Sequence, residues 1–156
     1  MSPTTTPTVR IERTLAAPPE RVYRAWLDPD LLRRWMAAGE FHVTRAEVDE
    51  RVGGRFEIFQ AGPDGVHRGG FSCEIVALEP PARIAIRWGF VGPDRVADPA
   101  HDSMLTVTFE PVDDGTRMTL VHERLEGLHA AMPEVAERVG TGWELATAKL
   151  PAALAS

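Results

Sequence analysis

The sequence predicts an α+β fold in which a curved antiparallel sheet wraps around a long C-terminal helix, with two short helices after the first strand. Short segments of alternating apolar and polar residues fill the middle of the chain, as expected for strands with one buried face. Two helix starts that contain proline follow the first of these segments. A late stripe has the three- and four-residue spacing of one helix face: Val139, Trp143, Ala146, Leu150 and Leu154.

The first strand is expected at residues 9–15, where apolar side chains share one face with Arg13. Pro18-Pro19-Glu20 then begins a helix, because proline is tolerated in the first turn and an acidic side chain is favoured there. Asp28 followed by Pro29 is a second helix start, with Asp28 as the N-cap. Gly39 ends this second helix.

Further strands are expected after the helices, and turns rich in glycine, proline or aspartate bound them. They cover residues 41–48, 55–59, 67–79, 83–90, 105–110 and 118–123. Within 67–79, the alternation places Phe71, Cys73 and Ile75 on one face, and Val76 and Leu78 on the other. The polar segment 91–103 is a long loop, which is either a lid or partner surface or a plain connector.

The final helix contains two glycines, Gly140 and Gly142, each of which weakens a helix by up to about 1 kcal/mol relative to alanine. Either the helix approaches the sheet or a ligand closely there, or the chain breaks between a short helix at 133–139 and a longer one after it. Pro151 is expected to end or kink the helix.

Length, charge and cysteine content restrict the class of protein. The 156 residues fit one domain at 8–156, after a disordered tail at 1–7. The net charge of -6 argues against binding to nucleic acid. No apolar run approaches the roughly 20 residues that span a bilayer, so we expect no membrane partner. The one cysteine, Cys73, fits a reducing compartment, and we expect the cytoplasm.

An ordered set of short motifs runs along nearly the whole chain. Its members are Ile11–Arg13, Ala17–Tyr23, Asp28-Pro29 with Leu32 and Trp35, Gly53–Phe56, Asp64-Gly65, Gly70, Pro80–Ile84, Trp88, Gly115–Leu120 and Gly142-Trp143. This set resembles the START-like (SRPBCC) superfamily, whose domain has the helix-grip fold. Within it, the chain is similar to the branch related to the C-terminal domain of the activator of the ninety-kilodalton heat-shock chaperone's ATPase. Where many relatives have a second tryptophan and Gly-Pro, this chain has Met36–Gly39.

The resemblance implies a deep apolar cavity between the sheet and the final helix. The residues alone leave a second interpretation open, in which the interior is filled and Trp143 is a core residue. The candidate ligand-binding residues are Tyr23, Trp35, Met36, Trp88, Phe90, Leu105, Val107, Phe109, Met118, Leu120, His122, Val139 and Trp143. Arg13 and His122 are the polar candidates, because each shares the inward face of its strand. Either one meets the polar end of a ligand, or it meets Glu57 or a backbone carbonyl.

Neither a metal nor a cofactor is expected. The five histidines have no metal-ligand spacing, and no cysteine cluster joins them. His101-Asp102 is interpreted as a solvated pair in the long loop. No second catalytic group can be placed beside His122, so no catalytic residue is assigned.

Three functional hypotheses follow, and binding without turnover is favoured. The first is non-enzymatic binding of a small hydrophobic molecule, such as a lipid, a polyketide or an aromatic metabolite. The second is a cyclase-like or hydratase-like enzyme that uses the same cavity, with His122, Arg13 and Tyr23 as its polar groups. The third is a stress-response module that interacts with a chaperone. A monomer and a homodimer are both compatible with the sequence.

Overall fold

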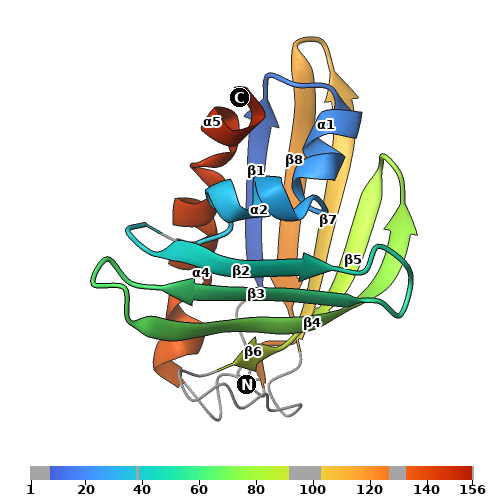
Figure 1. Ribbon diagram of the computed structural model, residues 1–156. Coiled ribbons are helices and arrows are strands. Elements are labelled where there is room, and N and C mark those ends of the chain that lie inside the picture. The colour runs from blue at the N-terminus through green and yellow to red at the C-terminus, as the bar shows by residue number, and fades with distance from the viewer. Residues whose placement is uncertain (1–7, 38, 92–102, 127–132, 156) are drawn as a thin grey trace, which may run out of the picture.

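The computed structural model describes residues 8–37, 39–91, 103–126 and 133–155 (Figure 1). The tail expected at 1–7, most of the expected loop at 91–103 and the His101-Asp102 pair lie outside these residues. The strands are β1 (Val9–Leu15), β2 (His42–Val48), β3 (Arg55–Ala61), β4 (His67–Glu79), β5 (Arg83–Trp88), β6 (Phe90–Val91), β7 (Ser103–Val112) and β8 (Gly115–Glu123). The helices are α1 (Pro19–Ala25), α2 (Pro29–Trp35), α4 (Pro133–Thr147) and α5 (Leu150–Ala155).

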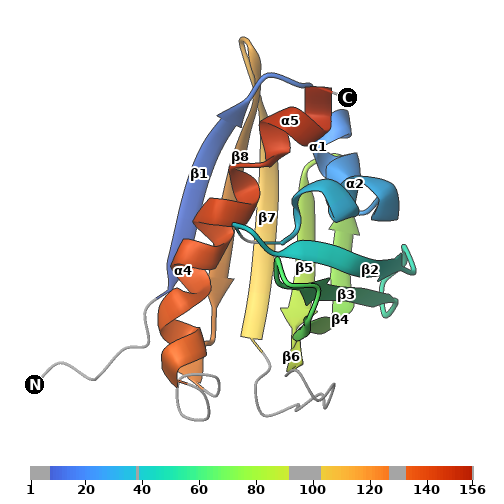
Figure 2. The ribbon, with the colours of Figure 1, turned by 60° about the vertical axis from the view of Figure 1, so that its left-hand side comes forward.

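The strands form one antiparallel sheet in the order β1-β8-β7-β5-β4-β3-β2, and the two-residue β6 pairs with β4. Figures 1 and 2 show that the sheet curls and that α4 lies along its open side next to β1, with α1, α2 and α5 gathered towards one end. This arrangement confirms the predicted α+β helix-grip architecture. No helix among the described residues has the length and apolar character needed to span a bilayer.

Both helix starts follow the predicted chemistry. Pro19 occupies the first turn of α1, and the side chain of Asp28 accepts a hydrogen bond from the Asp30 backbone N–H at 2.9 Å. This cap supplies an acceptor for one of the N–H groups left open at a helix N-terminus. Trp35, at the end of α2, is buried and donates from Nε1 to the carbonyl of Ala25 at 2.9 Å. The two helices are therefore fixed to each other as well as to the sheet.

The alternation in β7 and β8 places apolar side chains inside, as predicted. The prediction for Leu78 in β4 is wrong. The register shifts between Ile75 and Ala77, where a β-bulge leaves an extra residue, Val76, in the strand. Ile75 and Leu78 then pair with Ile86 and Ile84 of β5, so they share one face instead of lying on opposite faces.

Helix α4 is continuous from Pro133 to Thr147, so the predicted break at its glycines is wrong. Neither glycine is required by a close approach to the sheet, and a close approach to a ligand stays a prediction. There is no break at Gly140 or Gly142. A Cβ atom on Gly140 would meet Val9 at an ordinary 3.7 Å, and one on Gly142 would meet nothing within 4 Å. The helix ends instead at the Ala148-Lys149 turn, and α5 follows with Pro151 in its first turn, as expected for proline.

Lys149 ties this turn to the segment that follows α2. Its Nζ donates to the carbonyl of Ala37 at 2.6 Å and to that of Phe41 at 3.3 Å. Partial burial lowers the pKa of Lys149 from its usual value. The junction between α4 and α5 is therefore held against the start of β2 by one cation on two backbone oxygens.

Replacement of two glycines by alanine is expected to have opposite effects on stability. A Cβ atom at Gly70 would lie 2.0 Å from the carbonyl oxygen of Ile58 on the neighbouring strand. We expect Gly70→Ala to lower the free energy of unfolding by about 2 kcal/mol or more, because β3 and β4 must separate. Gly142→Ala, which meets nothing, should raise it by up to about 1 kcal/mol. Urea denaturation measures both changes, and a Gly70→Ala variant as stable as the wild type would contradict the argument.

Candidate functional site

The residues predicted to bind a ligand form one connected apolar core between the sheet and the helices. Two of these residues differ from the rest. The structure does not describe the side chain of Phe90, and His122 is a buried polar residue that adjoins the core. The others run along the length of the interior instead of gathering at one point. Tyr23 packs edge-on against Phe109 near α1, with ring centroids 5.7 Å apart, whereas Val139 and Trp143 come from α4. Their role in binding a ligand stays a prediction.

The centre of this core is closely packed. A side chain that borders a void large enough for water keeps some accessible surface facing that void. Seven of the predicted residues have an exposed fraction of 0%: Trp35, Trp88, Leu105, Val107, Met118, Leu120 and His122. No water-sized space therefore borders these side chains in the described conformation, and a ligand must displace protein atoms to reach them.

His122 lies at the centre of a hydrogen-bonded chain that crosses four elements. Trp143 of α4 donates from Nε1 to His122 Nδ1 at 3.0 Å. His122 Nε2 lies 2.6 Å from the hydroxyl oxygen of Ser103, at the start of β7. That hydroxyl also donates to the carbonyl of Trp88 in β5 at 3.2 Å. These hydrogen bonds therefore link the C-terminal helix to β8, β7 and β5.

The chain of donors fixes the tautomer of His122. An indole N–H can only donate, so His122 Nδ1 must accept and the ring proton sits on Nε2. Nε2 then donates to the Ser103 oxygen, and the Ser103 hydroxyl donates in turn to the Trp88 carbonyl. Burial lowers the pKa of His122 from 6.5 to about 3, because the charged imidazolium would lose its hydration. His122 is therefore a neutral ring with both nitrogens engaged.

This geometry differs from that of a catalytic Ser–His pair. There, the histidine nitrogen that faces the serine accepts the hydroxyl proton, and an acidic group holds the other nitrogen. Here the nitrogen facing Ser103 carries a proton, and the other nitrogen is held by the Trp143 N–H. Sequence reasoning missed Ser103, although it shares the inward parity of Leu105 in the same strand.

The four tryptophans of the chain form a continuous series of ring contacts. The ring centroids of Trp35 and Trp26 are 4.6 Å apart, those of Trp26 and Trp143 are 5.7 Å apart, and those of Trp143 and Trp88 are 5.2 Å apart. Phe56 and Phe71 extend the series beyond Trp88, at 5.7 and 4.9 Å. The interior beneath α4 is therefore largely aromatic, and aromatic rings in such tilted contacts attract one another.

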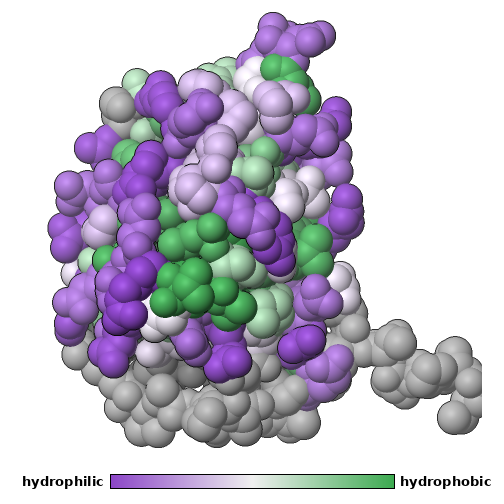
Figure 3. Space-filling model, turned by 90° about the vertical axis from the view of Figure 1, so that its right-hand side faces the viewer, coloured by the Kyte–Doolittle hydropathy of each residue, from purple (hydrophilic) through white to green (hydrophobic). Residues whose placement is uncertain are grey.

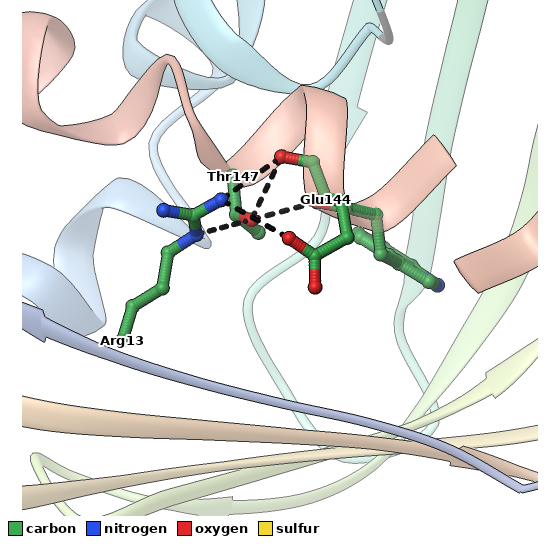
Figure 4. A network of polar contacts seen from close by, with 4 residues as sticks. Arg13, Glu144 and Thr147 are labelled. Carbon is green, nitrogen blue, oxygen red and sulfur yellow. Dashed lines mark hydrogen bonds and ion pairs between the residues drawn. The ribbon is translucent and has the colours of Figure 1, made fainter. Parts of the chain in front are cut away.

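Arg13 contacts the last turn of α4 (Figure 4). Its Nε donates to the Thr147 hydroxyl at 2.8 Å and its Nη2 donates to the Glu144 carbonyl at 3.1 Å, while the Glu144 carboxylate lies 3.5 Å away. A cation at the C-terminus of a helix is stabilised by the helix dipole and by the open carbonyls. Arg13 is expected from the sequence to meet the polar end of a ligand, Glu57 or a backbone carbonyl, and in the structure it meets a backbone carbonyl, that of Glu144.

The remaining polar features are one core residue, Tyr23, and a hollow at the surface. Tyr23 has a raised pKa because of burial and then because of the negative charge of Glu50. A surface hollow of about 500 Å³ lies at the edge of the sheet, lined by Pro29, Ala46, Glu47, Val48, Asp49 and Arg55. None of the predicted site residues lines it. In the described part of the chain, no three His, Cys, Asp or Glu residues are grouped as a metal site would require.

A curled antiparallel sheet that holds one long helix over an aromatic interior defines the class of helix-grip proteins. The chain matches the family model "Activator of Hsp90 ATPase homolog 1-like protein" over residues 16–155, and it therefore belongs to that family. This confirms the resemblance seen in the motifs. No curated protein matches the chain.

Solved structures share the fold over almost the full chain. A Chromobacterium violaceum protein is 31% identical with a TM-score of 0.72, and the match covers 94% of this chain and 96% of that one. A Mycobacterium smegmatis protein is 27% identical with a TM-score of 0.78, covering 96% and 92%. A Silicibacter pomeroyi protein that carries the same family name is 24% identical with a TM-score of 0.77, covering 96% and 98%, which shows the fold alone.

The neutral state of His122 predicts a loss of stability in mild acid. Its folded pKa of about 3 lies below the unfolded value of 6.5, so between these values the unfolded chain binds a proton that the folded chain does not. The contribution of His122 to the free energy of unfolding is complete above pH 6.5 and falls as the pH drops towards 3. At pH 5 we expect a loss of about 2 kcal/mol from this residue, measured by urea denaturation at pH 7 and pH 5.

Two variants separate this loss from that of other groups. His122→Gln should lower stability at pH 7 but lose less between pH 7 and pH 5 than the wild type. His42→Gln changes an exposed histidine and should keep the wild-type difference. The same loss in His122→Gln as in the wild type would show that the imidazole is not the titrating group.

Proposed function

We propose that this protein binds a small hydrophobic molecule between the sheet and α4 without transforming it. A lipid, a polyketide and an aromatic metabolite fit this class. One observation carries the proposal: within the described residues, the backbone of α4 comes close to β1, while apolar side chains that include all four tryptophans fill the distance to the rest of the sheet. Side chains repack more readily than backbone, so this volume is the part of the interior that a ligand can occupy.

The polar groups of the interior support binding over catalysis. Among the described residues, no Asp, Glu, Lys or Arg is buried. The buried polar groups beneath α4, Ser103 and His122, already bond to each other and to neighbouring groups. A general base needs a free lone pair within reach of the proton that it removes, and His122 offers none in this arrangement.

The exposed edges of the core favour entry beside α4. Val139 and Trp143, on the inner face of the helix, keep small exposed fractions of 7% and 5%, in contrast to the fully covered centre. Phe71 of β4 is only partly buried where it packs against this core. We infer that the ligand displaces side chains at this edge first and that the centre stays closed without it.

A pair of variants on one helix tests this location. Val139→Phe enlarges a side chain on the inner face of α4, whereas Leu145→Phe enlarges one that is 47% exposed on the outer face. We expect calorimetric titration with oleate, flavone and naphthalene to give saturable binding of at least one probe to the wild type. Val139→Phe should weaken that binding by about tenfold, and Leu145→Phe should leave it unchanged.

Some results of the same titrations would contradict the proposed binding function. Absence of saturable heat with all three probes would contradict a hydrophobic binding function. Equal effects of the two variants would place the site elsewhere. Mass spectrometry of the probes after incubation should find unchanged masses, since no turnover is expected. A new product mass would support the cyclase-like or hydratase-like alternative instead.

A second candidate function is interaction with the chaperone Hsp90, which membership of this family favours. The outer surface offers apolar contacts for a protein partner: Val52 is 61% exposed and Val76 is 38% exposed. Figure 3, which faces the right-hand side of Figure 1, shows an apolar area surrounded by hydrophilic residues. Compact apolar areas with a polar surround are typical of protein interaction sites.

The ATPase rate of purified Hsp90 tests this candidate. If the outer face contacts the chaperone, the wild-type protein should change the rate, and a Val52→Glu, Val76→Glu double variant should not. Leu145→Glu, at an exposed site on α4, serves as the control and should act like the wild type. An Hsp90 rate that does not respond to the wild-type protein would exclude this function.

A further inference from the structure

The buried indole N–H of Trp88 has no hydrogen-bond partner in the described structure. The other three tryptophans each have one. Trp26 donates to the Met118 sulfur at 3.3 Å, Trp35 donates to the Ala25 carbonyl, and Trp143 donates to His122. A buried donor without an acceptor is costly, and most such groups in proteins find a partner. The exception at Trp88 therefore marks a place where an acceptor from outside the chain is favoured.

The polar groups beside Trp88 cannot supply that acceptor. Both ring nitrogens of His122 are engaged, one by Trp143 and one by Ser103. The hydroxyl of Ser103 already contacts His122 and the carbonyl of Trp88. With an exposed fraction of 0%, Trp88 also borders no water-sized space. Neither the described part of the protein nor solvent therefore provides a hydrogen-bond acceptor for the indole N–H of Trp88.

The surroundings of Trp88 favour a flat ring in the bound molecule. Phe71, Trp143, Phe56 and His122 lie around the indole, with ring centroids 4.9, 5.2, 5.7 and 6.1 Å away, all tilted or edge-on. Aromatic ligands gain most from such contacts, because ring edges and faces attract each other. Of these four rings, that of Phe71 alone is only partly buried, so we expect its movement to uncover Trp88.

The charge of the interior restricts the acceptor. No Lys or Arg is buried among the described residues, so a carboxylate placed at Trp88 would have no cation beside it. A neutral oxygen, such as that of a ketone, lactone, quinone or ether, avoids this cost. In apolar surroundings the hydrogen bond from the indole to such an oxygen is stronger than it would be in water.

We propose that Trp88 is the specificity-determining donor of the binding site, and that the ligand is a neutral aromatic compound with one carbonyl or ether oxygen bound to Trp88 Nε1. This inference rests on the proposed binding function and narrows its ligand class. It favours neutral aromatic carbonyl compounds over fatty acids and over pure hydrocarbons.

Two probes of the same skeleton test the inference. Benzophenone has a carbonyl oxygen where diphenylmethane has a CH₂ group. By calorimetric titration, the wild type should bind benzophenone about fivefold tighter or more. Trp88→Phe keeps an aromatic ring but removes the N–H, so the two probes should then bind equally. Diphenylacetate, which carries a carboxylate, should bind the wild type more weakly than benzophenone.

Trp26→Phe is the matched control, because that residue is not among the predicted ligand-binding residues and its indole N–H already bonds to the Met118 sulfur at 3.3 Å. It should retain the preference for benzophenone. If Trp88→Phe does not fold, the wild-type protein still gives a direct measurement. The ¹H–¹⁵N resonance of the Trp88 indole should move downfield with benzophenone and not with diphenylmethane, while the Trp26 resonance stays in place.

The outcomes separate this inference from the proposed function. Equal binding of benzophenone and diphenylmethane to the wild type would overturn the role of Trp88 and leave hydrophobic binding intact. A preference that survives in Trp88→Phe would overturn it in the same way. Failure of the wild type to bind these probes or oleate, flavone and naphthalene would overturn the binding function, and this inference with it.

Discussion

One neutral imidazole connects the C-terminal helix to the sheet. His122 accepts a hydrogen bond from Trp143 of α4 and donates one to Ser103 of β7, which in turn donates to the backbone carbonyl of Trp88 in β5. Each donor in this chain meets an acceptor only when the ring is uncharged and its proton is on Nε2. The hydrogen bonds that join α4 to β8, β7 and β5 therefore depend on that single protonation state.

The other anchors of α4 lie at its C-terminal end. Arg13 reaches the last turn from β1, and Lys149 holds the following turn against the carbonyls of Ala37 and Phe41. Towards Trp143 and Val139, the helix instead rests on side chains. The helix is therefore held by charged and backbone contacts at its C-terminal end, and by side-chain packing and the Trp143–His122 hydrogen bond nearer its middle.

Much of the fold could be predicted because local patterns carry it. Alternation in β7 and β8 decides which side chains point inwards, and Asp28 with Pro29 decides where α2 begins. The bulge at Val76 has no local signal, so the face of Leu78 was predicted wrongly. The partners of His122 lie 19 and 21 residues away and come from packing between elements. The parity of β7 does place Ser103 inwards, but parity alone does not say what it contacts.

The series of four tryptophans has an optical consequence. Trp35, Trp26, Trp143 and Trp88 follow one another with ring centroids 4.6 to 5.7 Å apart, and these four are all the tryptophans of the chain. At such separations, excitation energy absorbed by one indole passes to the next before it is emitted. A molecule that quenches the fluorescence of Trp88 therefore lowers the fluorescence intensity of all four tryptophans. The protein carries within its core an intrinsic optical reporter of what lies beside that ring.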